Sequence, residues 1–198
     1  MLNPSEKKFL LSLARRTLEK YLKEKTILEV DGESLPSCIF QEKRGVFVTL
    51  TKSGQLRGCI GNIEPGKPLY QGIIENTLAA ALFDPRFTPV KLQELPEIKI
   101  EISILSNLKP VPKFSSYQEL LDYLRQKKPG VLIKKGAHQA TFLPQVWEEL
   151  REPQEFLSHL CVKAGLPPQC IKESGLEIYE YQVEHFQEED RKDKKPIE

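Results

Sequence analysis

The stretch Leu56-Arg57-Gly58-Cys59-Ile60-Gly61 places a thiol between two glycines, with a guanidinium group two residues before it. Successive side chains of a β-strand face opposite sides, so Arg57 and Cys59 would share one face and Gly58 would lie on the other. A nearby cation favours the thiolate, which is the nucleophilic form of cysteine. Glycines leave the sulfur uncrowded and let a ligand approach the backbone. The stretch therefore predicts a strand that carries a candidate site at Arg57 and Cys59.

This strand has a predicted partner immediately before it. The run Gly45–Leu50 is rich in β-formers, and the short loop Lys52-Ser53-Gly54-Gln55 separates it from Leu56. Two β-rich runs around a short loop that contains glycine are typical of a hairpin. We therefore expect an antiparallel pair with the candidate site on its second strand.

Outward from the hairpin, helical and strand patterns alternate. Apolar spacing and capping residues predict helices over 4–25 and 68–82, from 116 onward, a short one from 144, and one after 153. Strands are predicted at Cys38-Ile39-Phe40 and over 97–105, 131–133, 139–143 and 176–186. The run 97–105 alternates isoleucine with polar residues, which is typical of an antiparallel sheet with one wet face.

These patterns favour an α+β fold built on antiparallel sheet rather than a parallel α/β sheet, whose strands would read as continuous apolar runs. We expect a single domain over residues 1–187. Two related halves are possible within it, at about 38–110 and 111–187, in addition to the helix 4–25. The charged segment 188–198 is expected to be a disordered tail.

The composition is that of an ordinary soluble globular protein, with 39% hydrophobic and 29% charged residues. A net charge of +1 gives no electrostatic case for binding nucleic acid or an anionic membrane. No apolar run has the length of a membrane span, and Met1–Lys8 lacks the apolar core of a signal peptide. Four cysteines in 198 residues do not suggest a disulfide framework. We expect a cytoplasmic protein with reduced thiols.

The hairpin sequence resembles that of a known family, the AMMECR domain. Phe47-Val48-Thr49-Leu50 together with Leu56–Gly61 is similar to the signature of that family. Further similar blocks follow in the same order, and the resemblance covers roughly residues 5–186: Asp84–Phe87, Glu101–Ser106, Phe142–Val146 and Leu160–Leu166. Prokaryotic members are often called AmmeMemoRadiSam system protein A.

The resemblance implies a fold of two intertwined subdomains with antiparallel sheet. The name implies association with a Memo-like protein and a radical S-adenosylmethionine enzyme, but the family brings no established reaction. This chain departs from the pattern at Cys170, where similar members often carry tryptophan, and in a short loop after Val146. Both departures concern the C-terminal half.

Each candidate site residue has a structural alternative. Besides a nucleophile, Cys59 can be a redox thiol or a small core residue. Arg57 can bind a ligand carboxylate or phosphate, or form a salt bridge to a residue such as Asp84. Gly58 and Gly61 can expose amide groups to an anion, or permit tight packing of two elements.

Two further groups of residues could contribute to a cleft around the cysteine. Asp84 and Arg86 can line the cleft, or simply pair with each other in a turn that ends a helix. Asn62 can donate a hydrogen bond to a substrate. Solvated or structurally satisfied positions are favoured for the three histidines, and a Cys–His pair would need spatial proximity that a sequence does not show.

No motif points to a metal or a cofactor. There is no Cys-x-x-Cys pair for zinc, and Cys161 and Cys170 are separated by a helix end and two prolines. The glycine spacing matches neither a P-loop nor a dinucleotide fingerprint. We expect no cofactor and no metal.

The leading hypothesis is a small enzyme or enzyme subunit with a cleft around Arg57 and Cys59. Cys59 would act as the nucleophile, Arg57 would favour the thiolate and hold a small anionic substrate, and Asp84, Arg86 and Asn62 would complete the walls. The alternative is a non-catalytic adaptor that binds partner proteins through the 56–61 surface. A regulator associated with nucleic acid is the weakest of the three, because the net charge is near zero.

Overall fold

The computed structural model describes residues 1–173 and 175–189, and it consists of two compact units. The described part of the first unit comprises residues 1–105 and 184–189, and the second unit spans residues 106–183 to the extent described. The sequence placed the division of the chain at about residue 110. Within these described residues, four α-helices and two β-sheets confirm the α+β class.

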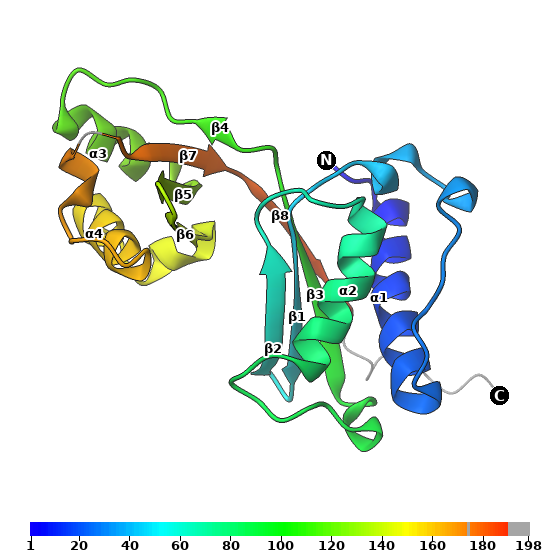
Figure 1. Ribbon diagram of the computed structural model, residues 1–198. Helices are drawn as coiled ribbons and strands as arrows, with labels where there is room; N and C mark the ends of the chain where they lie inside the picture. The colour runs from blue at the N-terminus through cyan, green and yellow to red at the C-terminus, as the bar shows by residue number, and fades with distance from the viewer. Residues whose placement is uncertain (174, 190–198) are drawn as a thin grey trace. The chain divides into compact units, whose positions relative to one another are not determined.

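The first unit is one four-stranded sheet with two helices (Figure 1). The strand order is β2-β1-β3-β8, and β1 pairs antiparallel with both β2 and β3. The elements are α1 (Pro4–Glu24), β1 (Val46–Lys52), β2 (Gln55–Asn62), α2 (Leu69–Leu82), β3 (Ile98–Leu105) and β8 (Val183–Gln187), with 3-10 turns η1 (Gly32–Ser34), η2 (Cys38–Gln41) and η3 (Leu92–Glu94).

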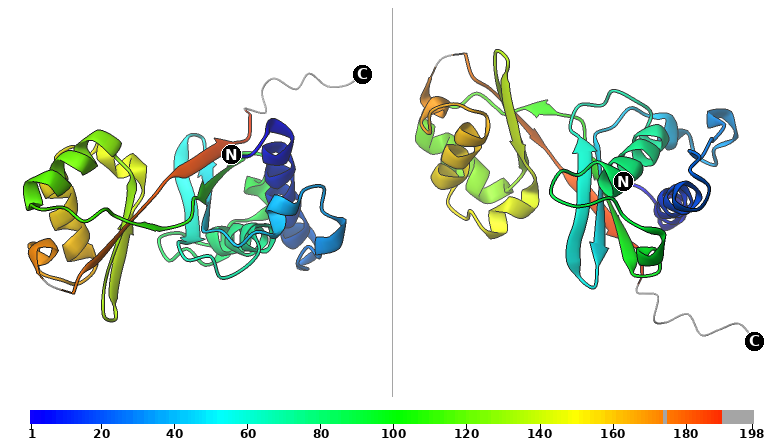
Figure 2. Two further views of the ribbon diagram at one scale, coloured as in Figure 1. Left: turned by 90° about the horizontal axis from the view of Figure 1, so that it is seen from above. Right: turned by 60° about the horizontal axis from the view of Figure 1, so that its bottom comes forward.

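Both helices cover the same face of this sheet (Figures 1 and 2). The expected capping box begins α1, since the Asn3 side chain accepts the amide of Glu6 and the Glu6 carboxylate accepts the amide of Asn3. The isoleucines of β3 that face the helices are buried, together with alternate residues of β1. The period-two pattern of the sequence therefore selects the core face correctly.

The second unit is a second four-stranded sheet, in the order β4-β7-β5-β6, with two helices. Its elements are β4 (Lys109–Pro110), α3 (Tyr117–Lys127), β5 (Gly130–Lys135), β6 (His138–Phe142), α4 (Pro153–Lys163) and β7 (Glu177–Tyr181), with 3-10 turns η4 (Pro144–Glu148) and η5 (Cys170–Lys172). Trp147 on η4 stacks on Phe156 of α4, with ring centroids 3.7 Å apart. Both residues belong to the hydrophobic core of the second unit.

Two strand predictions are wrong. Residues 38–41 form the 3-10 turn η2, in which Phe40 is buried and stacks on Phe9. A run of three apolar residues has no periodicity that separates a strand from a turn. The expected strand 176–186 is two strands in two sheets, and the chain changes sheet at Gln182, whose backbone bonds to both the amide and the hydroxyl of Ser106.

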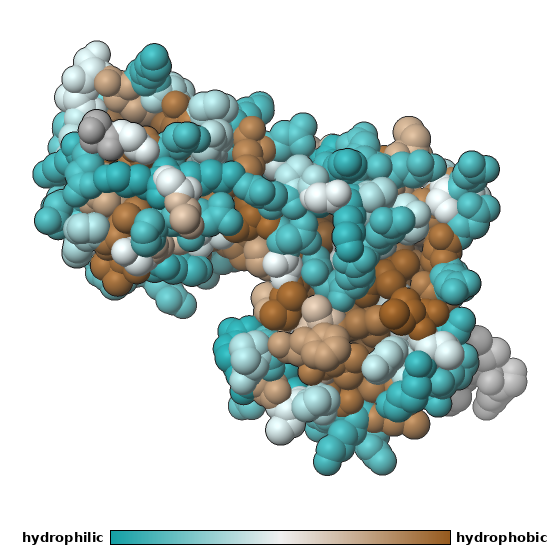
Figure 3. Space-filling view, viewed as in Figure 1, coloured by the Kyte–Doolittle hydropathy of each residue, from teal (hydrophilic) through white to brown (hydrophobic). Residues whose placement is uncertain are grey.

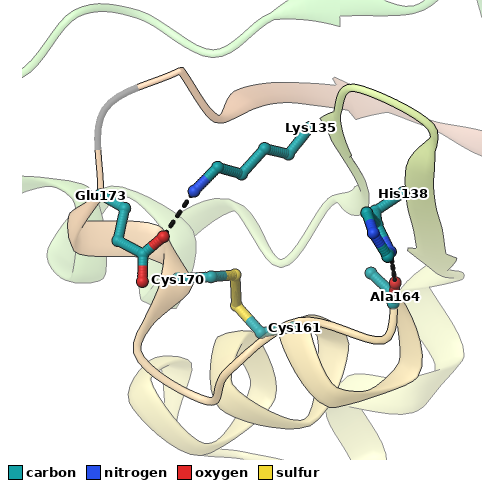
Figure 4. Close-up of a disulfide and its surroundings, with 6 residues drawn as sticks. All are labelled: Lys135, His138, Cys161, Ala164, Cys170 and Glu173. Carbon is teal, nitrogen blue, oxygen red and sulfur yellow. Dashed lines mark hydrogen bonds and ion pairs between the residues drawn. A yellow bond between two sulfur atoms is a disulfide. The ribbon is translucent and has the colours of Figure 1, made fainter.

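The expectation of reduced thiols is also wrong, because Cys161 and Cys170 form a disulfide (Figure 4). Cys161 lies in the last turns of α4 and Cys170 begins η5. Gly165, with φ +74°, ends the helix, and the Leu166 amide turns back to the Cys161 carbonyl. The helix end that was expected to keep the two cysteines apart therefore reverses the chain and brings their Cα atoms to 6.1 Å. Cys38 and Cys59 remain free thiols.

The charged C-terminal segment is described only in part. Glu188, which the sequence assigned to the tail, donates its amide to Ile100, and its carboxylate pairs with the buried Arg15. Residues 190–198 lie outside the described part of the chain. Among the described residues, no helix combines the length and apolar character needed to cross a membrane.

Candidate functional site

Close packing of β2 on α2 orients the candidate site. A Cβ atom on Gly58 would lie 2.1 Å from the Ala80 carbonyl oxygen of α2, so only glycine fits between the two backbones. Gly58 is buried and faces α2. Cys59, which pairs with Thr49, therefore faces the opposite side of the sheet, whereas Arg57 stands at a bulge of β2 where the alternation of the strand is interrupted.

Cys59 is a half-buried free thiol whose backbone and sulfur are both held. Thr49 of β1 lies directly across from it and donates its hydroxyl to the sulfur at 3.3 Å. The Cys59 amide donates to the Asp84 carboxylate at 2.8 Å, and the Cys59 carbonyl accepts from the Arg86 guanidinium at 3.4 Å. Cys59 is therefore held by hydrogen bonds at its sulfur, its amide and its carbonyl.

Asp84 anchors this arrangement from the turn after α2. Its side chain is only 2% exposed and accepts three hydrogen bonds from Arg86, two from the guanidinium and one from the amide. These bonds and the Cys59 amide hold the pKa of Asp84 well below its usual range, although burial opposes the shift. Arg86 itself stays 55% exposed, so its charge is fixed beside the cysteine yet open to solvent.

The Arg57 guanidinium binds a carboxylate other than that of Asp84. It forms a bidentate salt bridge with Glu94 of η3, at 3.0 and 3.1 Å, and its side chain is 13% exposed. This pairing is the main reason that the pKa of Glu94 falls to about 2, with smaller contributions from the Lys91 amide and the Lys52 charge. The salt bridge foreseen for Arg57 exists, but with Glu94 rather than Asp84.

One aromatic ring connects the two arginines. The guanidinium carbons of Arg57 and Arg86 lie 6.0 and 5.5 Å from the centroid of the Phe87 ring. Arg86 and Phe87 come from the turn after α2, whereas Arg57 comes from β2. Hydrogen bonds thus join Cys59, Asp84 and Arg86, and Arg57 approaches this group across the Phe87 ring.

Gly61 and Asn62 have structural contacts farther along β2. A Cβ on Gly61 would lie 2.6 Å from the Phe47 Cα atom, so the residue permits close packing of the hairpin. Asn62 donates its amide to the Glu64 carbonyl and accepts a hydrogen bond from Asn76. Both positions fix the end of the strand next to the site.

Sequence reasoning missed Thr49, Phe87 and Glu94. Thr49 and Phe87 stand inside the quoted family blocks, so block membership was a signal for both. Nothing in the sequence singles out Glu94, which lies 37 residues after Arg57.

No histidine lies beside the cysteine in the described part of the first unit, and no metal set accompanies it there. The one histidine of that part, His185, lies on β8, and two strands separate β8 from β2 in the sheet order. Among residues 1–173 and 175–189, no group of three or more His, Cys, Asp or Glu side chains could hold a metal ion.

Comparison with known proteins places the chain among archaeal relatives. The AMMECR1 family model matches residues 11–186. A protein of Methanothermobacter thermautotrophicus is 39% identical over 95% of this chain and 97% of its own length, and protein MJ0810 of Methanocaldococcus jannaschii is 39% identical over 95% and 92%. The crystal structure of the uncharacterized protein PH0010 from Pyrococcus horikoshii matches with a TM-score of 0.79 and 36% identity, over 91% of this chain and 90% of that one.

Proposed function

The chain belongs to the AMMECR1 family, and from that premise and the geometry at Cys59 we propose a small enzyme or enzyme subunit that acts on a small anionic substrate. One observation carries the proposal. The half-buried Cys59 sulfur accepts the Thr49 hydroxyl, while Asp84 fixes the exposed Arg86 guanidinium beside the same residue. A thiol with a hydrogen-bond donor and an adjacent open cation is an arrangement suited to nucleophilic chemistry on anions.

In the proposed step the Cys59 thiolate, having lost its proton to solvent, forms a bond to an electrophilic carbon of the substrate. The leaving group departs with the electron pair of the broken bond. Arg86 pairs with the anionic group of the substrate, and Thr49 donates to the sulfur before attack. Arg57 is a positioning residue, because its side chain is only 13% exposed in the salt bridge with Glu94, whereas that of Arg86 is 55% exposed although it pairs with Asp84.

Alkylation with two matched reagents tests the proposal. We would measure the rates for anionic iodoacetate and neutral iodoacetamide on a Cys38→Ser protein, in which Cys59 is the remaining free thiol. Arg86→Gln should lower the ratio of the iodoacetate rate to the iodoacetamide rate severalfold. Arg16→Gln, at an exposed arginine of α1, is the matched control and should leave the ratio unchanged. A Cys59 that reacts only after unfolding would refute the nucleophile.

A second candidate function, a non-catalytic adaptor, is favoured by the pairing of Arg57 with Glu94, which leaves one motif charge unavailable to a substrate. Leu56 of the same motif is 43% exposed and Phe83, the C-cap of α2, is highly exposed. Figure 3 shows apolar surface over α2. The partners implied by the family name are a Memo-like protein and a radical S-adenosylmethionine enzyme.

Calorimetric titration with a purified Memo-like protein distinguishes the two candidates. An adaptor surface predicts that Leu56→Glu abolishes binding, whereas Cys59→Ser binds as the unaltered protein does. Loss of a measured activity in Cys59→Ser, with partner binding retained, would favour the enzyme.

A further inference from the structure

The second unit contains a surface cavity of about 580 Å³ that the proposed function does not use. It lies among the segment between β4 and α3, the first turns of α3, η5 and β7. Its volume is within the range of small-molecule sites in proteins. All residues of the cavity named below belong to the second unit.

The wall of the cavity is mainly apolar. Several of its side chains are only partly buried, so each packs on the core of the unit with one side and faces the cavity with the other. The apolar wall consists of Val111, Phe114, Leu120, Ile171, Leu176 and Ile178. An apolar molecule would cover this surface and remove it from water, which is favourable at about 25 cal/mol per Å².

The charged residues of the cavity have one sign. Lys113 and Lys172 line it, and no acidic side chain does. Within the described residues neither lysine makes a salt bridge or a side-chain hydrogen bond. Lys172 instead lies over the ring of Tyr117, with its Nζ atom 4.7 Å from the centroid. The cavity therefore offers two cations that no anion of the chain neutralises in this part of the structure.

The backbone at Lys172 is restrained by a covalent link nearby. Lys172 ends η5, which begins at Cys170, and the disulfide to Cys161 ties that turn to α4 (Figure 4). The next residue, Glu173, pairs with Lys135 of β5 at 2.5 Å. A turn held at both ends loses little entropy when its lysine binds a ligand.

We propose that this cavity binds a small monocarboxylate with an apolar body. The body would lie on the apolar wall, and the carboxylate would pair with Lys172 and Lys113. Tyr117, whose pKa burial raises, keeps its proton at neutral pH and adds no negative charge to the cavity. The proposal goes beyond the proposed function, since it involves neither Cys59 nor any residue near it.

Calorimetric titration of the whole protein with sodium octanoate and, separately, with 1-octanol tests the proposal. The two probes share the apolar chain and differ in charge. We expect octanoate to bind more tightly than octanol. Lys172→Met keeps the aliphatic stem and removes the charge, so it should weaken octanoate about tenfold and leave octanol unchanged within twofold.

Two further variants make the result decisive. Lys128→Met, at an exposed lysine of the same unit outside the cavity, should leave octanoate binding unchanged. Ser115→Trp places a large ring at an exposed position of the cavity wall and should abolish binding of both probes. Absence of octanoate binding at millimolar concentration would overturn the proposal, and so would equal octanoate affinity in the unaltered and Lys172→Met proteins.

Discussion

Replacement of Gly58 by alanine is the sharpest test of how the site is built. The added Cβ would lie 2.1 Å from the Ala80 carbonyl oxygen and 3.0 Å from the Ala80 carbonyl carbon. Both atoms belong to the backbone of α2, so no side-chain rotation relieves the clash. Gly58 has no positive φ, and the effect is therefore purely steric.

The expected cost follows from the distance. A carbon and an oxygen that are not bonded rest about 3.2 Å apart, so α2 must retreat by about 1 Å from a sheet on which it is closely packed. Overpacking of this kind costs about 1–3 kcal/mol, and the rigid obstacle places Gly58→Ala at about 3 kcal/mol. Gly66→Ala is the matched control, because nothing lies within 4 Å of its Cβ and its φ is not positive. It should change stability by less than about 0.5 kcal/mol.

Native-state hydrogen exchange measures this difference in stability for the first unit separately from the second. A loss of 3 kcal/mol should accelerate exchange of the slowest amides of β1 and β2 by about 150-fold. Amides of β5 in the second unit serve as the internal reference. The reasoning about close packing is refuted if Gly58→Ala exchanges within threefold of Gly66→Ala.

Three further outcomes are expected. Replacement of both Cys161 and Cys170 by alanine should lower the unfolding free energy of the second unit by about 2.7 kcal/mol, because the disulfide closes a loop of ten residues at a sequence separation of 9. Urea titration with tryptophan fluorescence measures this loss. The pKa of Glu94 is lowered to about 2 in the folded protein. The stability that the ionised Glu94 contributes to folding is therefore complete above about pH 4.5 and is lost as the pH falls toward 2. Acid titration of Glu94→Gln should show a smaller loss of stability over that pH range. Asp84→Asn releases Arg86 from its ion pair, so the iodoacetate rate at Cys59 should rise relative to the iodoacetamide rate.

Much of the first unit could be predicted because its signals are local. The capping box at Asn3 and the alternating isoleucines of β3 each depend on neighbours within one element. The hairpin of β1 and β2 likewise follows from two β-rich runs and a short turn. Periodicity also placed Arg57 and Cys59 on a common face, but Arg57 lies at a bulge that interrupts the alternation of β2.

The register of that hairpin could not be predicted. Thr51 pairs with Leu56, but Leu50 pairs with Gly58, so β2 holds one extra residue at a bulge. Without the bulge Thr49 would lie opposite Gly58 and would not reach the sulfur of Cys59. A single inserted residue therefore decides which side chain bonds to the thiol, and no propensity of the sequence records it.

The contacts that connect distant segments were also beyond the sequence. Glu94 binds Arg57 only because the chain after α2 folds back along the edge of the sheet. The Cys161–Cys170 pair depends on a reversal at Gly165 that local patterns show only as the end of a helix. The exchange of sheets at Gln182 is invisible because alternation continues through both strands.

The position of β2 at the edge of its sheet gives the Asp84–Arg86 pair a second consequence. The outer side of an edge strand presents free amide and carbonyl groups that another strand can pair with. At Cys59 these groups are already taken, the amide by Asp84 and the carbonyl by Arg86. A partner therefore cannot add a strand across this point without breaking both bonds and exposing a buried carboxylate. It follows that the Asp84–Arg86 pair protects this edge of the sheet from strand addition at Cys59.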